Sequence, residues 1–478
     1  TRVTGGSRIK IRHEYEVVRV EAAGAGPGTI TPVRVPAAGD VLLTAQTLLG
    51  VTDTLMLAPL GPVPLAGAGL AFAASIIVGA TVYGLISGVP MRIGAAFGAG
   101  RNRAVPGMLR AGLVLGALAG VIGALAMVAF WPALRHLGQP PDVLAVLFPY
   151  WCLIAGLTLP FAVLMVLKSA FEAVGRPWLG TAFAYLGAAL NVPLNYLLIY
   201  GGGPVPALGL TGAGIGSVLA ETLALIAALA WLRLSPRLAR LRLPRRLDWA
   251  EVGAAGREGA PMGLMYLAET GAMTCMTLII GTFGAVALAA NQVAMSVGGL
   301  IYMLPLGMAQ AVAIRVAQAR GAGEHDRLRA VVWAGLVLAT LWLGGAMVVL
   351  VTGGRAIAGA ISPDEQVVTL AAAIFVVFAA MQIFDGIQST MVGALRGLSA
   401  TGIAARASTL AFWGLGLPAA WLIGHSMGWG VPGVWAGWLV AQVAAGAVLV
   451  VRFLALTRLP GAAHGPSLTP HASPEPCR

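Results

Sequence analysis

The chain has 478 residues, of which 58% are apolar and only 10% are charged, and its mean hydropathy is +0.86. This composition excludes a soluble globular protein and indicates one with many membrane spans. The formal net charge of +12 at pH 7 is compatible with nucleic acid or with anionic lipid, and the placement of the charges decides between them.

Apolar runs of at least ~18 residues, the length that a helix needs to cross a bilayer, occur twelve times along the chain. They predict an all-α integral membrane fold with spans at approximately 39–58, 65–90, 107–130, 146–167, 179–201, 207–232, 261–281, 285–311, 330–352, 367–391, 405–425 and 431–456. The chain is then expected to contain a polar N-terminal tail (1–37), an N-lobe of six spans (38–232), a cytoplasmic linker (233–260), a C-lobe of six spans (261–456) and a disordered C-terminal tail (457–478).

The Lys and Arg residues lie almost entirely on one side of these spans. With both termini placed in the cytoplasm, every one of the 30 except Arg135 and Arg355 falls in a tail or a cytoplasmic loop. Such an asymmetry fixes the orientation of a membrane protein. We therefore expect a multi-pass protein of the cell inner membrane, with both termini cytoplasmic and with membrane lipids, not nucleic acid, facing the basic residues.

Polar side chains in the N-lobe spans predict a first site. Asp53 lies in span 1, and Asn191 and Asn195 in span 5 share one helical face because they are four residues apart. These three residues form a predicted polar cluster, although amides in lipid also serve simply to bond neighbouring helices. Glu221 in span 6 is a further deep acid to which the sequence assigns no role.

Two acids in the C-lobe predict the principal site. Glu269 in span 7 and Asp385 in span 10 lie deep in apolar segments, where a central Asp costs ~2.5–3.5 kcal/mol and so indicates function. Tyr266 and Gln388 lie one turn from these acids, and Gln292 near the start of span 8 adds an amide. Oxygen ligands suit a hard cation such as Na⁺, and two neighbouring carboxylates can also exchange a proton. We therefore predict a cation-coupling site at the two acids, with Na⁺ or H⁺ as the coupling ion.

Other sources of energy have no residues to support them. The only lysines, Lys10 and Lys168, are not part of the Gly-Lys-Ser/Thr that a phosphate-binding loop requires. The six histidines lie in tails, loops or near span ends, which leaves no material for a metal site or a histidine relay. Without a nucleophile and base in one span region, we expect a transporter that uses no cofactor and is not an enzyme.

One motif occurs twice. The segment RIGAAFGAG at 92–100 aligns without a gap with RVAQARGAG at 315–323, which lies 223 residues later. GLTGA at 209–213, which opens span 6, likewise resembles GVPGV at 430–434, which opens span 12. The matching offsets predict two six-helix lobes of the same topology, related by a pseudo-two-fold axis along the membrane normal.

On four segments the chain resembles the multidrug and toxic compound extrusion (MATE) family, particularly its NorM-like branch. They are AQTLLGVTDTLML (45–57), LNVPLNYLLIYG (190–201), AANQVAMSVGGLIYMLPLGMAQAVAIRVAQARGAG (289–323) and FDGIQSTMVGALRG (384–397). The resemblance implies a V-shaped antiporter of twelve helices that exports lipophilic, mostly cationic small molecules in exchange for Na⁺ or H⁺.

The same resemblance implies roles for individual residues. Glu269 and Asp385 correspond to the cation-site carboxylates of spans 7 and 10, and Gln292 corresponds to a cavity residue. Asp53, Asn191 and Asn195 correspond to the polar cluster of the N-lobe. Met381 stands where the branch often has Tyr one turn before the span 10 acid, so we expect Tyr266 to supply the missing ligand from span 7.

A lipid-linked precursor flippase of the same superfamily is the alternative function. Such proteins commonly carry extra spans and several cationic side chains in the cavity, whereas here essentially no Arg or Lys lies in the middle of a predicted span. The sequence therefore favours the exporter of small organic cations, which we expect to act as a monomer.

Overall fold

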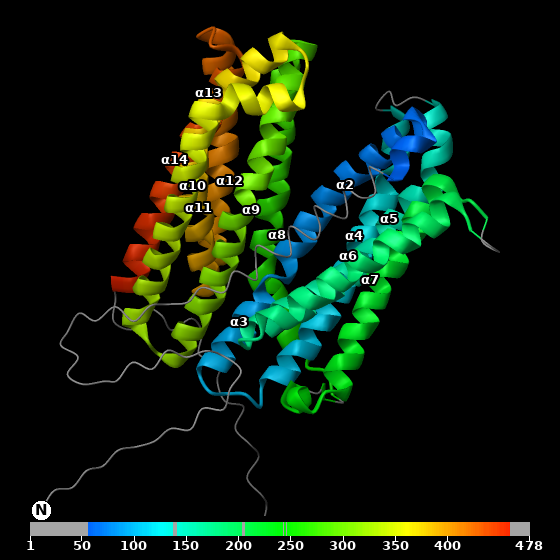
Figure 1. Cartoon of the computed structure of the whole chain (residues 1–478). Coiled ribbons are helices and arrows are strands. Elements are labelled where there is room, and N and C mark those ends of the chain that lie inside the picture. The colour runs from blue at the N-terminus through cyan, green and yellow to red at the C-terminus, as the bar shows by residue number, and fades with distance from the viewer. Residues whose placement is uncertain (1–55, 137–140, 203–205, 242, 245, 459–478) are drawn as a thin grey trace, which may run out of the picture. The chain divides into compact units, whose positions relative to one another are not determined.

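A computed structural model of the chain describes residues 56–458, apart from 137–140, 203–205, 242 and 245. This part is built of helices (Figure 1). In the N-terminal half they are η1 (Ala58–Leu60), α2 (Pro62–Ile86), α3 (Gly88–Gly98), α4 (Val105–His136), α5 (Pro141–Ala173), α6 (Pro177–Tyr200), α7 (Gly209–Leu234) and η2 (Pro236–Leu241). In the C-terminal half they are α8 (Trp249–Gly281), α9 (Ala285–Ala322), α10 (His325–Ile361), α11 (Glu365–Gly397), α12 (Thr401–Ala411), η3 (Phe412–Gly416), α13 (Leu417–Trp421), η4 (Leu422–Ser426) and α14 (Gly430–Arg458).

Eleven helical segments of the described part are long and apolar enough to cross a membrane. They match predicted spans 2 to 12 one for one, with α2 and α3 forming a single segment and α12 to η4 forming another. Most of predicted span 1, at 39–58, lies outside the described residues, as do the N-terminal tail and most of the C-terminal one. The twelfth helix therefore stays a prediction.

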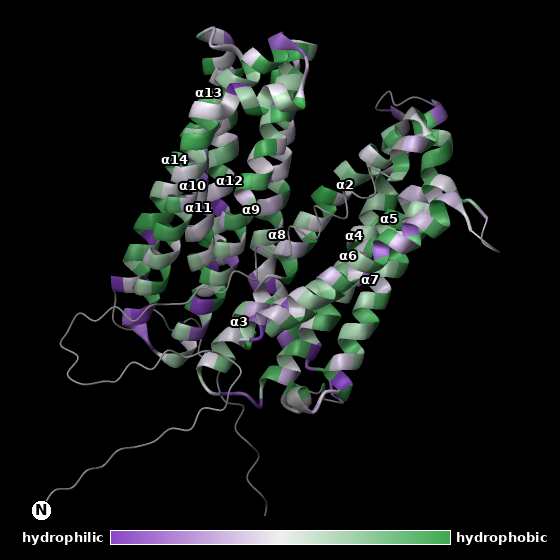
Figure 2. Cartoon of the chain, viewed as in Figure 1, coloured by the Kyte–Doolittle hydropathy of each residue, from purple (hydrophilic) through white to green (hydrophobic). Residues whose placement is uncertain are grey.

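The surface of these helices is largely apolar along their length, and hydrophilic residues gather toward the helix ends (Figure 2). Leu264, Leu341 and Leu410, for example, are 67%, 68% and 70% exposed. A helix satisfies all of its interior backbone hydrogen bonds within itself, so such a surface is stable against hydrocarbon. The exposed apolar faces of the bundles thus suit a lipid environment.

The described helices pack in two groups. In the N-lobe, α4, α5, α6 and α7 pack together, with α2 and α3 against α4 and α5; in the C-lobe, α9, α10, α11 and α14 pack together, with α12 and α13 against α14 (Figure 1). The two groups meet where α2 packs against α8 and where α3 packs against α9.

Glycine allows the close approach of helices where the lobes meet. A Cβ atom on Gly84 would lie 2.6 Å from the backbone nitrogen of Gly263, so α2 and α8 touch backbone to backbone. A side chain on Gly98 would collide with the carbonyl oxygen of Gln318, and one on Gly321 with the carbonyl oxygen of Ala95. These last two contacts are reciprocal, because Gln318 and Gly321 lie 223 residues after Ala95 and Gly98.

A similar correspondence is found inside each lobe. A Cβ atom on Gly112 would lie 2.5 Å from Cγ1 of Val89, and a Cβ atom on Gly335 would lie 2.5 Å from Cγ2 of Val312. Both residues of the second pair follow those of the first by 223 positions. Residues at this spacing therefore make the same helix contact in each lobe.

The predicted linker differs from the observed structure. Residues 249–260 belong to α8, which begins at Trp249 and carries Asp248 as its N-cap, with the Asp248 side chain accepting from the backbone nitrogens of Ala250 and Glu251. The charged residues Glu251, Arg257 and Glu258 interrupt the apolar run in this turn, so a search for apolar segments placed the start of span 7 twelve residues too late.

Candidate functional site

Asp385 lies near the middle of the C-lobe on α11. This helix begins at Asp364, whose side chain caps the backbone nitrogens of Gln366 and Val367, and it continues unbroken to Gly397. The Asp385 side chain is buried, and its Oδ1 accepts a hydrogen bond of 2.8 Å from Nε2 of Gln442 on α14. A neighbouring helix therefore holds the predicted acid through an amide.

Glu269 on α8 is the neighbour that the sequence predicted for Asp385. The two carboxyl groups lie close enough to interact electrostatically. Tyr302 on α9 interacts with both acids, and its hydroxyl group is hydrogen-bonded with Ser389, one turn after Asp385. The C-lobe thus brings two carboxylates, an amide and two hydroxyl groups together from four helices.

Sequence analysis missed Gln442 and Tyr302. Gln442 is the only carboxamide or acid in predicted span 12, and Tyr302 is the only tyrosine in predicted span 8. Each is an isolated polar group on an apolar helix, and that was the available signal. Neither has a polar partner in its own helix, so only the packing of α9, α11 and α14 brings them to the acids.

Tyr266 lies between the acid pair and a buried guanidinium group. It interacts electrostatically with both Glu269 and Arg396, and its ring centroid is 6.0 Å from that of Tyr83 on α2, at an interplanar angle of 52°. Arg396, in the last turn of α11, is 3% exposed and lies 6.0 Å from the Tyr83 ring centroid.

Gln310 on α9 completes this group. Its Oε1 accepts a 3.0 Å hydrogen bond from the Tyr83 hydroxyl group and another from Nη2 of Arg396. Because Tyr83 belongs to the N-lobe and the other members belong to the C-lobe, these contacts join the lobes. The polar groups therefore continue from the acid pair to the end of α11 where the lobes meet.

The remaining C-lobe candidates point elsewhere. Nε2 of Gln388 donates to the Ser408 hydroxyl group on α12, at 3.0 Å, and not to Asp385. Two residues three apart on a helix differ by 60° in direction, so the shared face predicted for them leads to different neighbours. Gln292 is exposed on α9, and Met381 is buried in the apolar core of the C-lobe.

The N-lobe amides lie together between α6 and α7. Nδ2 of Asn191 donates to the Ser217 hydroxyl group at 3.0 Å, and Nδ2 of Asn195 donates to Oδ1 of Asn191 at 3.1 Å. These bonds join two helices, which is the structural role that the sequence left open for them. Asp53, the third predicted member, lies outside the described residues. Glu221, one turn after Ser217, directs Oε2 toward Gly187 on α6.

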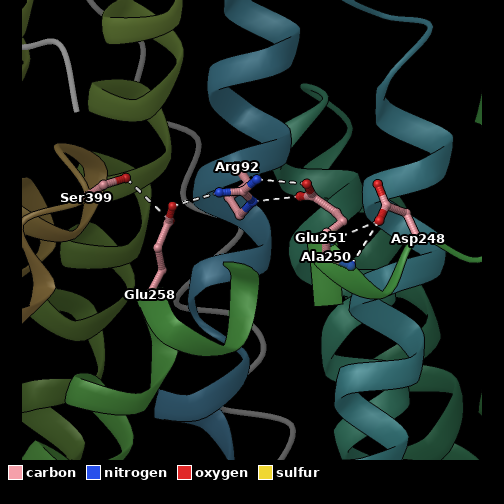
Figure 3. A network of polar contacts seen from close by, with 6 residues as sticks. All are labelled: Arg92, Asp248, Ala250, Glu251, Glu258 and Ser399. Carbon is pink, nitrogen blue, oxygen red and sulfur yellow. Dashed lines mark hydrogen bonds and ion pairs between the residues drawn. The ribbon is translucent and has the colours of Figure 1, made fainter. Parts of the chain in front are cut away.

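A second polar network joins the lobes near the start of α8 (Figure 3). Arg92 on α3 bonds to both carboxylate oxygens of Glu251, at 2.6 and 2.7 Å, and to Glu258 at 2.9 Å. The Ser399 hydroxyl group, after α11, donates to the other oxygen of Glu258 at 3.4 Å. We call these four residues the Arg92 network.

The sequence gave Arg92 only a place in the repeated motif and in the charge count. Glu251 and Glu258 lie seven residues apart, on one face of α8, and both carboxylates are less than a quarter exposed. Paired charged hydrogen bonds from one guanidinium group fix geometry as well as charge. The Arg92 network therefore holds α3 to the first turns of α8.

Comparison with known proteins gives a consistent result. The MatE family model matches residues 36–197 and 261–422, once in each half of the chain. The "Probable multidrug resistance protein NorM" of Rhizobium meliloti (strain 1021) is 30% identical over 430 residues, covering 88% of this chain and 91% of that protein. The protein of the same name from Synechococcus sp. (strain ATCC 27144) is 31% identical over 424 residues, covering 87% of this chain and 91% of that protein.

Solved structures share the fold. The eukaryotic MATE transporter AtDTX14 superposes with a TM-score of 0.80 at 20% identity, covering 89% of this chain and 96% of that one. The Vibrio cholerae MATE transporter VcmN in its bent form superposes with a TM-score of 0.79 at 21% identity, covering 89% and 95%. The arrangement of the described helices is therefore that of these transporters.

Proposed function

Because the chain belongs to the MatE family, we propose that it is a multidrug efflux transporter that exports lipophilic, mostly cationic compounds in exchange for Na⁺ or H⁺. Its relatives named as multidrug resistance proteins match it over nearly their whole length. The class is thus a membrane transporter and not an enzyme, and the coupling ion takes the place of a cofactor.

The observation that carries the coupling is the pair Glu269 and Asp385. Two carboxyl groups close enough to interact, away from water, repel each other when both are ionised. A cation or a proton relieves that repulsion, and its release restores it. The free-energy difference between the loaded and unloaded pair is what an ion-driven cycle requires.

Alternating access needs lobes that can separate at one end while they close at the other. The reciprocal glycine contacts of α3 and α9, together with the matched contacts inside each lobe, support a pseudo-two-fold relation between two six-helix lobes. Two polar connections, one through Arg92 and one through Tyr83, join the lobes at one end. We assign this end to the cytoplasm of an inner-membrane protein, because Arg101, Arg103 and Arg110 follow α3 there.

The flippase alternative is less favoured. Its relatives in this comparison are named for multidrug resistance. In the described part, the buried cationic side chains Lys168 and Arg396 lie within the last two turns of their helices, and Lys168 pairs with Glu172 at 3.1 Å. A cavity for a lipid phosphate would instead place unpaired cations near the middle of the membrane.

Efflux from proteoliposomes tests the proposal. The purified chain, reconstituted alone, is loaded with a fluorescent lipophilic cation, and inward Na⁺ and proton gradients are imposed separately. We expect one of the gradients to drive export above the rate of protein-free liposomes. Equal rates with and without protein under both gradients would overturn the coupled-antiport proposal.

A further inference from the structure

Gln442 has one hydrogen-bonding group without a partner at the centre of the C-lobe. Its side chain is 2% exposed, and its Nε2 donates to Asp385 at 2.8 Å. Its Oε1 is buried and accepts no hydrogen bond from the part of the chain that the structure describes. Buried polar atoms are nearly always hydrogen-bonded, so an exception beside a functional carboxylate needs an explanation.

The neighbours of this amide point to its ligand. Asp385 and Glu269 concentrate negative charge at the site, and Tyr302 brings a hydroxyl oxygen next to them. An amide oxygen is a ligand for a hard cation and an acceptor for a hydrogen donor. The same amide now offers its N–H to Asp385, which suits a carboxylate that carries no cation.

We propose that Gln442 is a ligand of the coupling cation, and that its amide turns about its last torsion when the cation loads. The torsion that orients an amide is broad and nearly two-fold, so a half-turn exchanges oxygen for nitrogen at little cost. In the unloaded site the N–H holds Asp385; in the loaded site that N–H would face the positive charge, and Oε1 replaces it. This inference rests on the proposed function and assigns a role to a third helix of the coupling site.

The position of α14 gives this turn a consequence. α14 packs along α11, and Nε1 of Trp435, two turns before Gln442, donates to Oδ1 of Asn291 on α9 at 3.1 Å. The helix that carries the amide is therefore held to both neighbours of the acid pair. A change of partner at Gln442 then reports cation loading to α14.

Two substitutions separate a cation ligand from a simple support for Asp385. Gln442→Leu and Gln442→Glu both remove the N–H that holds Asp385, but only Gln442→Glu keeps oxygen at the site. In the proteoliposome assay, we expect Gln442→Leu to raise the half-saturating concentration of the driving cation about tenfold, the equivalent of ~1.4 kcal/mol. We expect Gln442→Glu to leave that concentration unchanged or lower it. An equal rise in both variants would overturn the ligand role.

A matched control is available on α11. Gln382 is also buried, and its Nε2 donates to the carbonyl oxygen of Gly298 at 3.2 Å. Gln382→Leu should lower the melting temperature of the purified protein without moving the half-saturating cation concentration. A shift as large as that of Gln442→Leu would show a general effect of losing a buried amide, and would contradict the proposal.

A binding measurement separates this inference from the proposed function. The melting temperature of the purified protein is followed against Na⁺ at fixed pH and against pH without Na⁺, because a cation that binds the folded protein raises its stability. If the wild type is stabilised and Gln442→Leu needs about tenfold more cation, the ligand role stands even where efflux is absent. If the cation dependence of both proteins is the same, the role fails even where wild-type efflux is normal.

Discussion

At the scale of the residue, the energy of the site is that of charge removed from water. Asp385 is buried beside Glu269, and the only neutral group that bonds Asp385 directly, among the described residues, is the Gln442 amide. A buried carboxylate without a cation is costly unless it is hydrogen-bonded. The site therefore exchanges stability for its response to a cation.

Removing either charge should separate stability from transport. We expect Glu269→Gln and Asp385→Asn each to reduce gradient-driven efflux to the rate of protein-free liposomes, because the repulsion that drives release is lost. Neither variant should fold less well, since each replaces a costly charge with an amide. Efflux rates and melting temperatures of the purified variants check this, and wild-type efflux from both variants would contradict the coupling role.

Tyr266 tests whether a ligand has moved from α11 to α8. Met381 packs in the apolar core, whereas Tyr266 interacts with Glu269. We expect Tyr266→Phe to raise the half-saturating concentration of the driving cation roughly fivefold, the equivalent of the ~1 kcal/mol that a neutral hydrogen bond contributes. Unchanged ion dependence and unchanged transport would remove Tyr266 from the site.

At the scale of the element, the contact of α3 with α9 depends on small residues. The two copies of the repeated motif meet there, and each copy presents a glycine to a carbonyl oxygen of the other. Helices that approach this closely gain packing contacts in lipid, where no hydrophobic effect draws them together. A methyl group is enough to separate them.

Alanine at this crossing should therefore destabilise the protein. We expect Gly321→Ala, which directs a methyl group at the carbonyl oxygen of Ala95, to cost about 1–3 kcal/mol through overpacking. Gly344→Ala on α10 is the control, because no atom lies within 4 Å of its added Cβ and alanine favours the helix. Thermal melting in detergent measures both, and equal melting temperatures would refute the close contact.

At the scale of the whole molecule, the two lobes are joined by contacts that the duplication does not repeat. Arg92 pairs with Glu251 and Glu258, but its counterpart Arg315, 223 residues later, donates to Gln318 on its own helix, at 3.3 Å. Among the described contacts, one guanidinium group of the repeated pair thus bridges the lobes through acids. An asymmetric bridge between otherwise similar lobes is suited to control one end of the transporter.

Breaking the Arg92 network should expose the contact of α3 with α9. A single cysteine at position 317, where Ala317 is fully buried against Gly94, replaces the three native cysteines as the reporter. We expect Arg92→Gln to raise its rate of labelling by a water-soluble maleimide severalfold. Arg327→Gln is the control, because the Arg327–Glu324 pair is exposed, at 63% and 46%, and such pairs contribute little. Equal labelling of all three proteins would show that the network does not hold this end closed.

The sequence by itself determined the spans, their orientation and the two acids. Hydropathy and charge are properties of each segment, and a bilayer selects for them one segment at a time. For this reason predicted spans 2 to 12 reappear as helices in the described part, and Glu269 and Asp385 stood out as costly charges on apolar segments.

Only the tertiary structure decided how the polar groups are paired. Gln442 is 57 positions from Asp385, Glu251 is 159 from Arg92, and Gln310 is 227 from Tyr83. Helix periodicity gives the direction of a side chain but not the neighbour it meets, which is why Gln388 was predicted beside Asp385 and instead bonds to Ser408. Partners of this kind depend on which helices pack together, and that is a property of the folded chain as a whole.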